Sequence, residues 1–182
     1  MSNDPDANAS NVVLRTERLV LRTFSLDDSE LILELLNEPS FLENIGDKGV
    51  RTAADARRYL ADGPLASYEQ HGFGLYRAEL AADGEAIGMC GLLRRDTLDD
   101  PDIGFAYLPR FWSRGYATEA AVAVMAYGRR TLGLGRLLAI TSPANVGSQR
   151  VLEKVGFDFA ESRQLPGESS PVHLYVCDPP KG

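Results

Sequence analysis

Three strand-like segments follow one another in the middle of this 182-residue chain, and no helical pattern separates them. They are GFGLYRAEL (72–80), EAIGMCGLLRR (85–95) and PDIGFAYL (101–108), joined by the turns AADG and DTLDD. Short apolar segments linked by such turns predict an antiparallel meander. A doubly wound nucleotide-binding fold is therefore disfavoured, because that fold interleaves its strands with helices.

The segments on either side of the meander predict the rest of the architecture. Before it, we expect a strand at 18–24, a helix from Ser25 to Pro39 and a helix from Thr52 that stops before Gly63-Pro64. After it, we expect a helix at 115–131, a strand at 136–142, a helix at 146–155 and a terminal hairpin of FDFAESRQ with VHLYVC. The predicted order is β-α-α-β-β-β-α-β-α-β-β, an α+β domain whose mixed, mostly antiparallel sheet carries helices on both faces.

Composition excludes several classes of protein. The net charge of −7 argues against a general binder of nucleic acid or of acidic membranes. No apolar run approaches the ~20 residues of a membrane span. The polar, acidic opening MSNDPDANASN is not a signal peptide, and it predicts a disordered lead-in over 1–13 before a single domain at 14–182.

The cysteines and histidines predict neither a disulfide scaffold nor a metal site. Cys90 and Cys177 each lie in an apolar, strand-like run, which favours buried thiols in a reducing cytoplasm. His71 and His173 lie far apart in the sequence, and no His, Cys or Asp cluster has metal-ligand spacing.

The stretch FWSRGYATEA (111–120) opens the long predicted helix with an unusual distribution of charge. Helix starts attract acids, yet Arg110 and Arg114 precede this one, and Glu119 is the only acid in its first turns. The free N–H groups of a helix start can bind phosphate, and Gly115 allows the backbone to come close. In one interpretation the arginines add charge-assisted bonds to that anion; in the other they are solvated and Gly115 only makes a turn. The chain has no G-x-x-x-x-G-K-[ST] phosphate loop.

Two longer segments carry a resemblance to a known family. IGMCGLLRRDTLDDPDIGFAYLPRFWSRGYATEAA and AITSPANVGSQRVLEKVGF closely resemble the GNAT N-acetyltransferase superfamily. Within it, the chain is most similar to the branch of the ribosomal-protein N-terminal acetyltransferases (RimJ/RimL type). The opening RLVLR and the terminal hairpin also match, so the resemblance covers about residues 15–178. It implies acetyl-CoA as co-substrate, an amine as acceptor and no metal.

The resemblance also implies a cofactor site. In this family the pyrophosphate rests on a loop of pattern [QR]-x-x-G-x-[GA], which maps to 112–117 and has Trp112 in place of Gln or Arg. The pantetheine arm lies in a gap between two parallel strands and pairs with the backbone of 105–108. The implied cofactor-binding residues are Phe105, Ala106, Tyr107, Leu108, Trp112, Ser113, Arg114, Gly115, Tyr116, Ala117, Thr118, Asn145, Ser148 and Arg150.

Acetyl transfer to an amine requires two proton transfers, because the amine must lose a proton and the leaving thiolate must be protonated or stabilised. By the resemblance, Asp102 matches a frequent carboxylate position and would accept the amine proton directly or through water. Its alternative is a solvated acid at a strand start. The family's usual tyrosine position holds Leu152, and the ribosomal branch uses a serine instead, which gives Ser148. The alternative for Ser148 is helix solvation or capping, and Tyr107 and Tyr116 are weaker candidates for the acid.

These inferences predict a cytoplasmic, acetyl-CoA-dependent N-acetyltransferase that works by direct transfer in a ternary complex. Cys90 lies in mid-strand, so no covalent intermediate is expected. The acceptor is a protein or peptide N-terminus or a small amine, with no nucleic acid or membrane partner, and a homodimer is expected only at the level of the family. Two other classes stay open: a non-catalytic acyl-CoA-binding regulatory module, and a binder of nucleotide phosphates.

Overall fold

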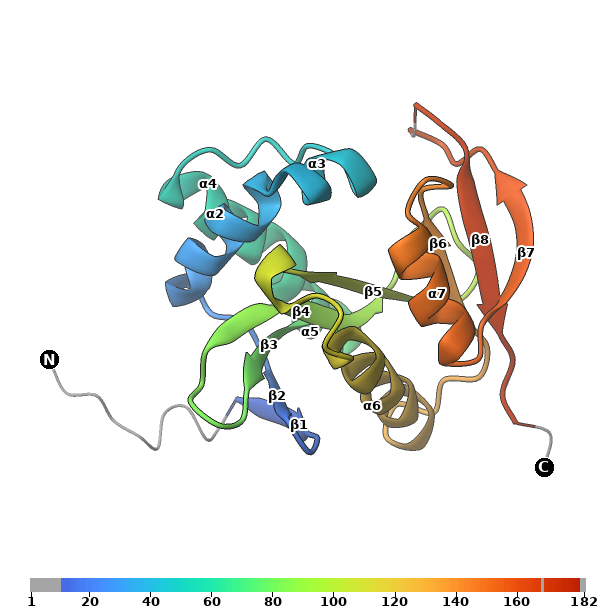
Figure 1. Cartoon of the computed structure of the whole chain (residues 1–182), viewed down its shortest axis with the longest axis horizontal. Coiled ribbons are helices and arrows are strands. Elements are labelled where there is room, and N and C mark those ends of the chain that lie inside the picture. Colours follow the sequence, from blue (N-terminus) through green and yellow to red (C-terminus); the bar gives the residue numbers. More distant parts are fainter. Residues whose placement is uncertain (1–10, 168, 181–182) are drawn as a thin grey trace, which may run out of the picture.

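The computed structural model describes residues 11–167 and 169–180. Over these residues, eight strands form one sheet in the order β1-β2-β3-β4-β5-β6-β8-β7 (Figure 1). The strands are β1 (Val12–Arg15), β2 (Leu19–Arg22), β3 (Leu75–Leu80), β4 (Ala86–Leu93), β5 (Asp102–Tyr107), β6 (Leu137–Thr141), β7 (Asp158–Arg163) and β8 (Val172–Cys177). The predicted meander is β3-β4-β5, and the predicted terminal hairpin is β7-β8.

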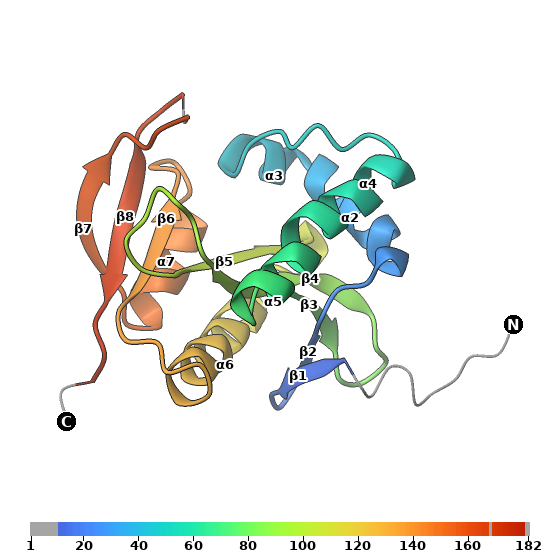
Figure 2. The same ribbon diagram turned by 180° about the vertical axis from the view of Figure 1, so that it is seen from behind.

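Helices cover both faces of the sheet, as predicted. α6 and α7 lie in front of it in Figure 1, whereas α4 and α5 lie in front of it in the opposite view of Figure 2. The helical segments are η1 (Leu26–Asp28), α2 (Ser29–Asn37), α3 (Pro39–Asn44), α4 (Ala53–Leu60), η2 (Ala61–Leu65), α5 (Ala66–His71), η3 (Pro109–Phe111), α6 (Tyr116–Arg130) and α7 (Val146–Lys154). Among the described helices, none combines the length and apolar character that crossing a bilayer requires.

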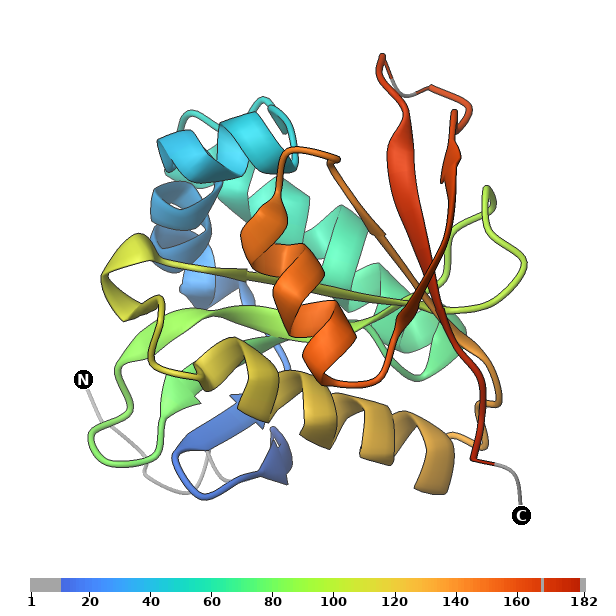
Figure 3. The same cartoon turned by 45° about the vertical axis from the view of Figure 1, so that its right-hand side comes forward.

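The sheet is interrupted between β5 and β6. Every other pair of neighbouring strands is antiparallel, and β4 pairs with β5 from Asp102 to Tyr107. β5 and β6 are parallel and are in register only at Asp102 and Leu138. Beyond that point β6 turns away from β5 behind α7 (Figure 3), so the later residues of β5 have no strand partner on this side.

The hydrophobic core has two clusters. The main cluster joins β2–β5 and residues of β6 and β8 to the helices, and α6 contributes small residues such as Ala120 and Ala121, both fully buried. Short side chains allow a helix to pack close to a sheet. A smaller cluster lies by the C-terminal strands and consists of Leu98, Leu138, Leu165 and Leu174.

Buried charges join the first helices to the sheet. Arg22 on β2 contacts Asp28 (Nη2–Oδ1, 2.8 Å) and Glu79 on β3 (Nε–Oε2, 3.4 Å), and Arg77 on β3 also contacts both acids. Burial alone would raise the pKa of Asp28, but hydrogen bonds from Arg22 and Ser25 hold that pKa below its ordinary value. This network fixes the start of α2, which leads into α3.

The structure differs from the predicted elements at two places. β1 begins at Val12, inside the range expected as a lead-in, and pairs with β2 at the edge of the sheet; residues 1–10 lie outside the described residues. The prediction that the second helix stops before Gly63-Pro64 is wrong. A π-helical segment, η2, absorbs Pro64, which has no N–H to donate, and the helix continues to His71, where Gly72 ends it at φ +76°.

Candidate active site

The loop before α6 presents backbone N–H groups to a cavity. Ser113 and Gly115 both have positive φ values (60° and 81°), which turn the chain sharply into the helix. Gly115 is the N-cap and has no side chain to accept a hydrogen bond, so the N–H groups of the first turn lack a capping partner. A helix start of this kind binds anions well.

Glu119 is the only acid in the first turns of α6, and its carboxylate is bound by residues outside the helix. Its Oε1 accepts hydrogen bonds from the Thr16 hydroxyl (2.6 Å) and the Arg18 N–H (2.8 Å), and its Oε2 accepts one from Arg18 Nε (2.7 Å). Arg18 also donates to the Arg114 carbonyl (2.9 Å) and lies over the Tyr116 ring. Glu119 therefore fixes the turn between β1 and β2 rather than capping α6.

The arginines that precede the helix do not line the cavity. Arg110 forms an ion pair with Glu34 (2.6 Å), and Arg114 lies beside the Phe111 ring. The inclusion of Arg114 among the cofactor-binding residues therefore has no support from this cavity and stays a prediction. The cations that do line this cavity are Arg150, which was predicted, and Lys154, which was not.

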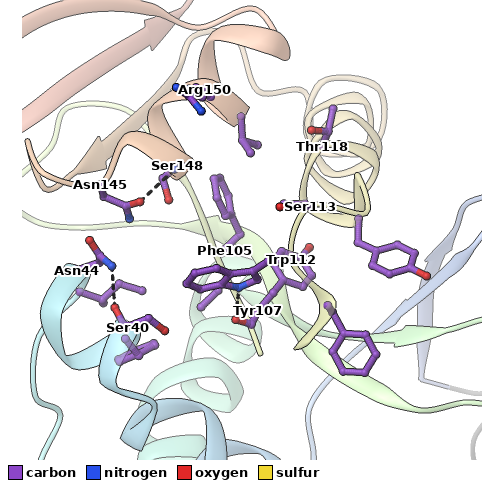
Figure 4. A pocket seen from close by; sticks show the side chains of 18 of the residues that line it. Ser40, Asn44, Phe105, Tyr107, Trp112, Ser113, Thr118, Asn145, Ser148 and Arg150 are labelled. Atoms are coloured by element: carbon purple, nitrogen blue, oxygen red, sulfur yellow. Dashed lines mark hydrogen bonds between the residues drawn. The ribbon is translucent and has the colours of Figure 1, made fainter. Parts of the chain in front are cut away.

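The first cavity has a volume of about 450 Å³. Its walls come from the end of β5, the loop and first turn of α6, the start of α7, and α3. In Figure 4, Asn145 and the α7 residue Ser148 lie opposite Ser40 and Asn44 of α3, and Phe105 and Trp112 lie beside them. The cavity thus brings together Phe105, Ala106, Tyr107, Trp112, Ser113, Gly115, Tyr116, Ala117, Thr118, Asn145, Ser148 and Arg150 of the predicted set.

The free edge of β5 supplies peptide groups to this cavity. The Leu108 N–H donates to Ile87 on β4 (2.9 Å), whereas the Pro101 carbonyl accepts from Leu138 on β6 (2.9 Å). Because peptide directions alternate along a strand, the peptide groups of Phe105 and Tyr107 point into the gap. Trp112 Nε1 donates to the Tyr107 carbonyl (2.7 Å). The groups that remain available to a ligand are the N–H and carbonyl of Phe105 and the N–H of Tyr107.

Leu108 and Ala106 direct their peptide groups away from the gap. Leu108 is fully buried, does not line the cavity and uses its N–H in the pairing with β4. Its assignment as a cofactor-binding residue stays a prediction. Ala106 lines the cavity, but by the same alternation its peptide groups point toward β4.

Ser148 is held at the start of α7 with its hydroxyl free of the capping role. Asn145 is the N-cap, and its Oδ1 accepts the Ser148 backbone N–H (3.1 Å). The cap is thus provided by Asn145, and Figure 4 shows the Ser148 side chain directed into the cavity. Of the weaker candidates, Tyr107 is buried, which holds its pKa well above the ordinary value, and the ring of Tyr116 is covered by Arg18.

A second cavity, of about 560 Å³, adjoins the first. Both cavities are lined by Phe41, Asn44, Ile45, Phe105, Asn145 and Ser148. The second extends over Tyr59, Arg95 and Asp102 and reaches the connection between β7 and β8 at residues 169–172. A group held beside Phe105 and Ser148 can therefore be approached from either cavity.

Asp102 lies in the wall of the second cavity. The residue is 1% exposed, and Arg95 Nε donates to both of its oxygens (3.1 and 3.0 Å). Burial raises the pKa of Asp102 to about 6, although the charge of Arg95 opposes the shift. The interpretation of Asp102 as a solvated acid is therefore wrong. It lies three residues before Phe105, about 10 Å along the strand.

The sequence reasoning missed the contribution of α3. Ser40, Phe41, Asn44 and Ile45 line the first cavity, but Pro39 was interpreted only as the end of the preceding helix. Proline also favours the first position of a helix, and Pro39 begins α3. In the described part of the chain, no group of His, Cys, Asp and Glu side chains could hold a metal ion.

Comparison with known proteins identifies the family. A sequence model of the acetyltransferase (GNAT) domain matches residues 18–158, so the chain belongs to this family. It is 27% identical to the uncharacterized N-acetyltransferase YnaD of Bacillus subtilis, over 79% of this chain and 81% of that one. An acetyltransferase structure from Agrobacterium tumefaciens has a TM-score of 0.75 at 27% identity and covers 90% of this chain and 92% of that one.

The fold is also that of the RimL ribosomal L7/L12 acetyltransferase, solved with coenzyme A. That likeness has a TM-score of 0.72 at 15% identity, with 92% of this chain and 98% of that one covered. The chain is therefore an acetyltransferase, a member of an enzyme class that uses acetyl-CoA as acetyl donor. The uncapped start of α6, the free edge of Phe105 and the cations Arg150 and Lys154 fit the phosphates and the amide-containing arm of that donor.

Proposed function

We propose that this protein transfers the acetyl group of acetyl-CoA directly to a primary amine in a ternary complex. The observation that carries the proposal is the shared wall of the two cavities at Phe105, Asn145 and Ser148. One cavity accommodates the donor and leaves the other for the acceptor. The amine nitrogen forms a bond to the acetyl carbon, the carbon–sulfur bond breaks, and CoA leaves as a thiolate.

We propose that Ser148 gives a proton or a hydrogen bond to that thiolate. The hydroxyl lies at the junction of the cavities, and Asn145 holds the helical turn that carries it. Leu152 occupies the position of the usual tyrosine and is buried, so it offers no competing donor. A tightly held first turn keeps the hydroxyl in place, which is what proton transfer in the transition state requires.

We propose that Asp102 accepts the amine proton through water. Its separation from Phe105, about 10 Å along the strand, exceeds direct reach and the span of one water, so the proton passes along a short chain of waters in the second cavity. With a pKa of about 6, Asp102 is ionised at neutral pH and is a stronger base than an ordinary aspartate.

The acceptor is a peptide or protein N-terminus or a small amine. The test is thiol release from acetyl-CoA with a panel of peptides, amino acids and small amines, with mass spectrometry of the product. We expect turnover with at least one acceptor and a mass gain of one acetyl group. CoA binding without turnover for any acceptor would favour the non-catalytic module, and binding of ATP but not of CoA would favour the nucleotide binder.

We also propose that the protein acts in the cytoplasm, where the buried free thiols of Cys90 and Cys177 would stay reduced. Oxidant-free mass analysis of protein from its source should find both thiols unmodified. The homodimer expected from the family stays a prediction, which light scattering in solution would test.

A further inference from the structure

Arg95 is held in a way that leaves part of its guanidinium available to the second cavity. Its Nε is engaged by both oxygens of Asp102, which is almost completely buried, while 39% of the Arg95 side chain stays exposed. Among residues 11–167 and 169–180, neither Nη nitrogen of Arg95 has a hydrogen-bond partner. A guanidinium fixed at Nε presents its two Nη groups as a preorganised fork, which matches a carboxylate.

Acetyl-CoA bound in the first cavity does not need the positive charge of Arg95. The start of α6 and the cations Arg150 and Lys154 are in the first cavity, whereas Arg95 lines only the second. Lys48, from the loop after α3, adds another positive charge to the second cavity. Of the acids in that wall, Asp102 is already paired with Arg95, and Glu43 is exposed.

We propose that the acceptor is a short peptide with a free amine and a free C-terminal carboxylate, and that Arg95 binds this carboxylate. This inference rests on the proposed function, because it assigns the second cavity to the acceptor. The acceptor amine lies at the junction by Phe105 and Ser148, and its carboxylate lies at Arg95. Asp102, which holds Arg95, is three residues from Phe105 along β5, a distance of about 10 Å. An extended peptide of two or three residues spans this distance between its amine and its carboxylate.

The experiment compares matched acceptors that differ only in the carboxylate. Dialanine and trialanine are each paired with their C-terminal amides, and kcat/KM is measured by thiol release at saturating acetyl-CoA. We expect the wild-type protein to prefer each acid over its amide by about tenfold or more, the usual effect of a charge-assisted contact. Equal values for acid and amide would overturn the inference and leave acetyl transfer standing.

Variants then test whether Arg95 causes the preference for the acid over the amide. Arg95→Gln should reduce the acid-to-amide ratio to near one, mainly through KM for the acid, and Arg95→Lys should retain part of the ratio. Arg94→Gln is the matched control, because the neighbouring Arg94 is exposed and donates to the Asp99 carbonyl (2.8 Å). A preference that persists in Arg95→Gln would overturn the assignment.

Arg95→Gln leaves the buried carboxylate of Asp102 without its partner, which can destabilise the fold. The double variant Arg95→Gln/Asp102→Asn removes both charges, and the binding ratio of acid to amide should again be near one. Calorimetry with CoA bound measures the same ratio without turnover. If no peptide, amino acid or small amine of the panel releases thiol, the proposed function fails. The calorimetric comparison still decides the inference: tighter binding of the acid supports it, and equal or absent binding overturns it.

Discussion

The two cavities that meet at Phe105 are built from different parts of the chain. The first includes the backbone groups at the free edge of β5 and at the uncapped start of α6. The second includes the side chains of Tyr59, Arg95 and Asp102, which come from segments far apart in the sequence. Donor recognition thus follows from the fold itself, whereas acceptor recognition depends on residues that can change without changing the fold.

The largest effect is expected where the cavities join. Ser148→Ala should lower kcat by about 10²–10⁴, the range for loss of one proton donor, and should change acetyl-CoA affinity far less. Steady-state kinetics and calorimetry of CoA binding measure the two effects. Ser162→Ala, on the exposed outer strand β7, is the control. Unchanged turnover would make Ser148 only a structural residue and direct attention to Tyr116.

A change confined to the second cavity should affect only the acceptor. Asp102→Asn should lower kcat/KM for the amine by about tenfold to a hundredfold at neutral pH, with CoA affinity unchanged. Since the pKa of Asp102 is about 6, wild-type activity should rise with pH through 6 as the carboxylate ionises. The variant should lack this rise, and its deficit should shrink as pH approaches the pKa of the amine. Superimposable pH–rate profiles would remove Asp102 from the mechanism.

A change confined to the first cavity should affect only the donor. Gly115→Val puts a side chain where φ is +81° and should weaken CoA binding by about tenfold or more, through loss of backbone contacts to phosphate. Gly133→Val is the matched control: its φ is +67°, and nothing lies within 4 Å of the added Cβ. Both variants should lose stability, by about 1–2 kcal/mol. Equal CoA dissociation constants for the two would contradict the site.

The smallest effect is a spectroscopic one. Trp112 is the single tryptophan of the chain, is 50% exposed and lines the first cavity. CoA bound there should shield the indole from water, so the tryptophan emission should shift and saturate with CoA. Acceptor peptides alone should leave the emission unchanged, because Trp112 does not line the second cavity. An emission insensitive to CoA would place the donor elsewhere.

The fold could be predicted well because its signals are local. The alternation of apolar residues and the turns at 81–84 and 96–100 predicted β3–β5, and Gly115 marked the start of α6. The errors arose where tertiary context outweighs local preference. Pro64 does not end its helix, because a π-helical turn accommodates it and its side chain is buried.

Some residues of the candidate site could likewise be predicted from the sequence, whereas their tertiary partners could not. Gly115 could be placed from the start of its helix, whereas Asn145 and Ser148 were predicted from the family resemblance. The partner of Asp102 could not be foreseen, since its pairing with Arg95 depends on how the loop between β4 and β5 folds back. Likewise, nothing local in Arg110 or Arg114 shows that one is paired with Glu34 and the other packs on Phe111.

The hydrogen bonds of Glu119 also set the N-terminal boundary that a shortened form of this domain must keep. The family match begins at Arg18, yet the hydroxyl that donates to Glu119 belongs to Thr16, and β1 begins at Val12. A truncated chain that starts at residue 18 would lose Thr16 and the strand that holds Arg18 against Arg114 and Tyr116. A boundary drawn from family similarity alone would thus remove contacts that hold the loop before α6, although the segment removed lies about a hundred positions earlier in the sequence.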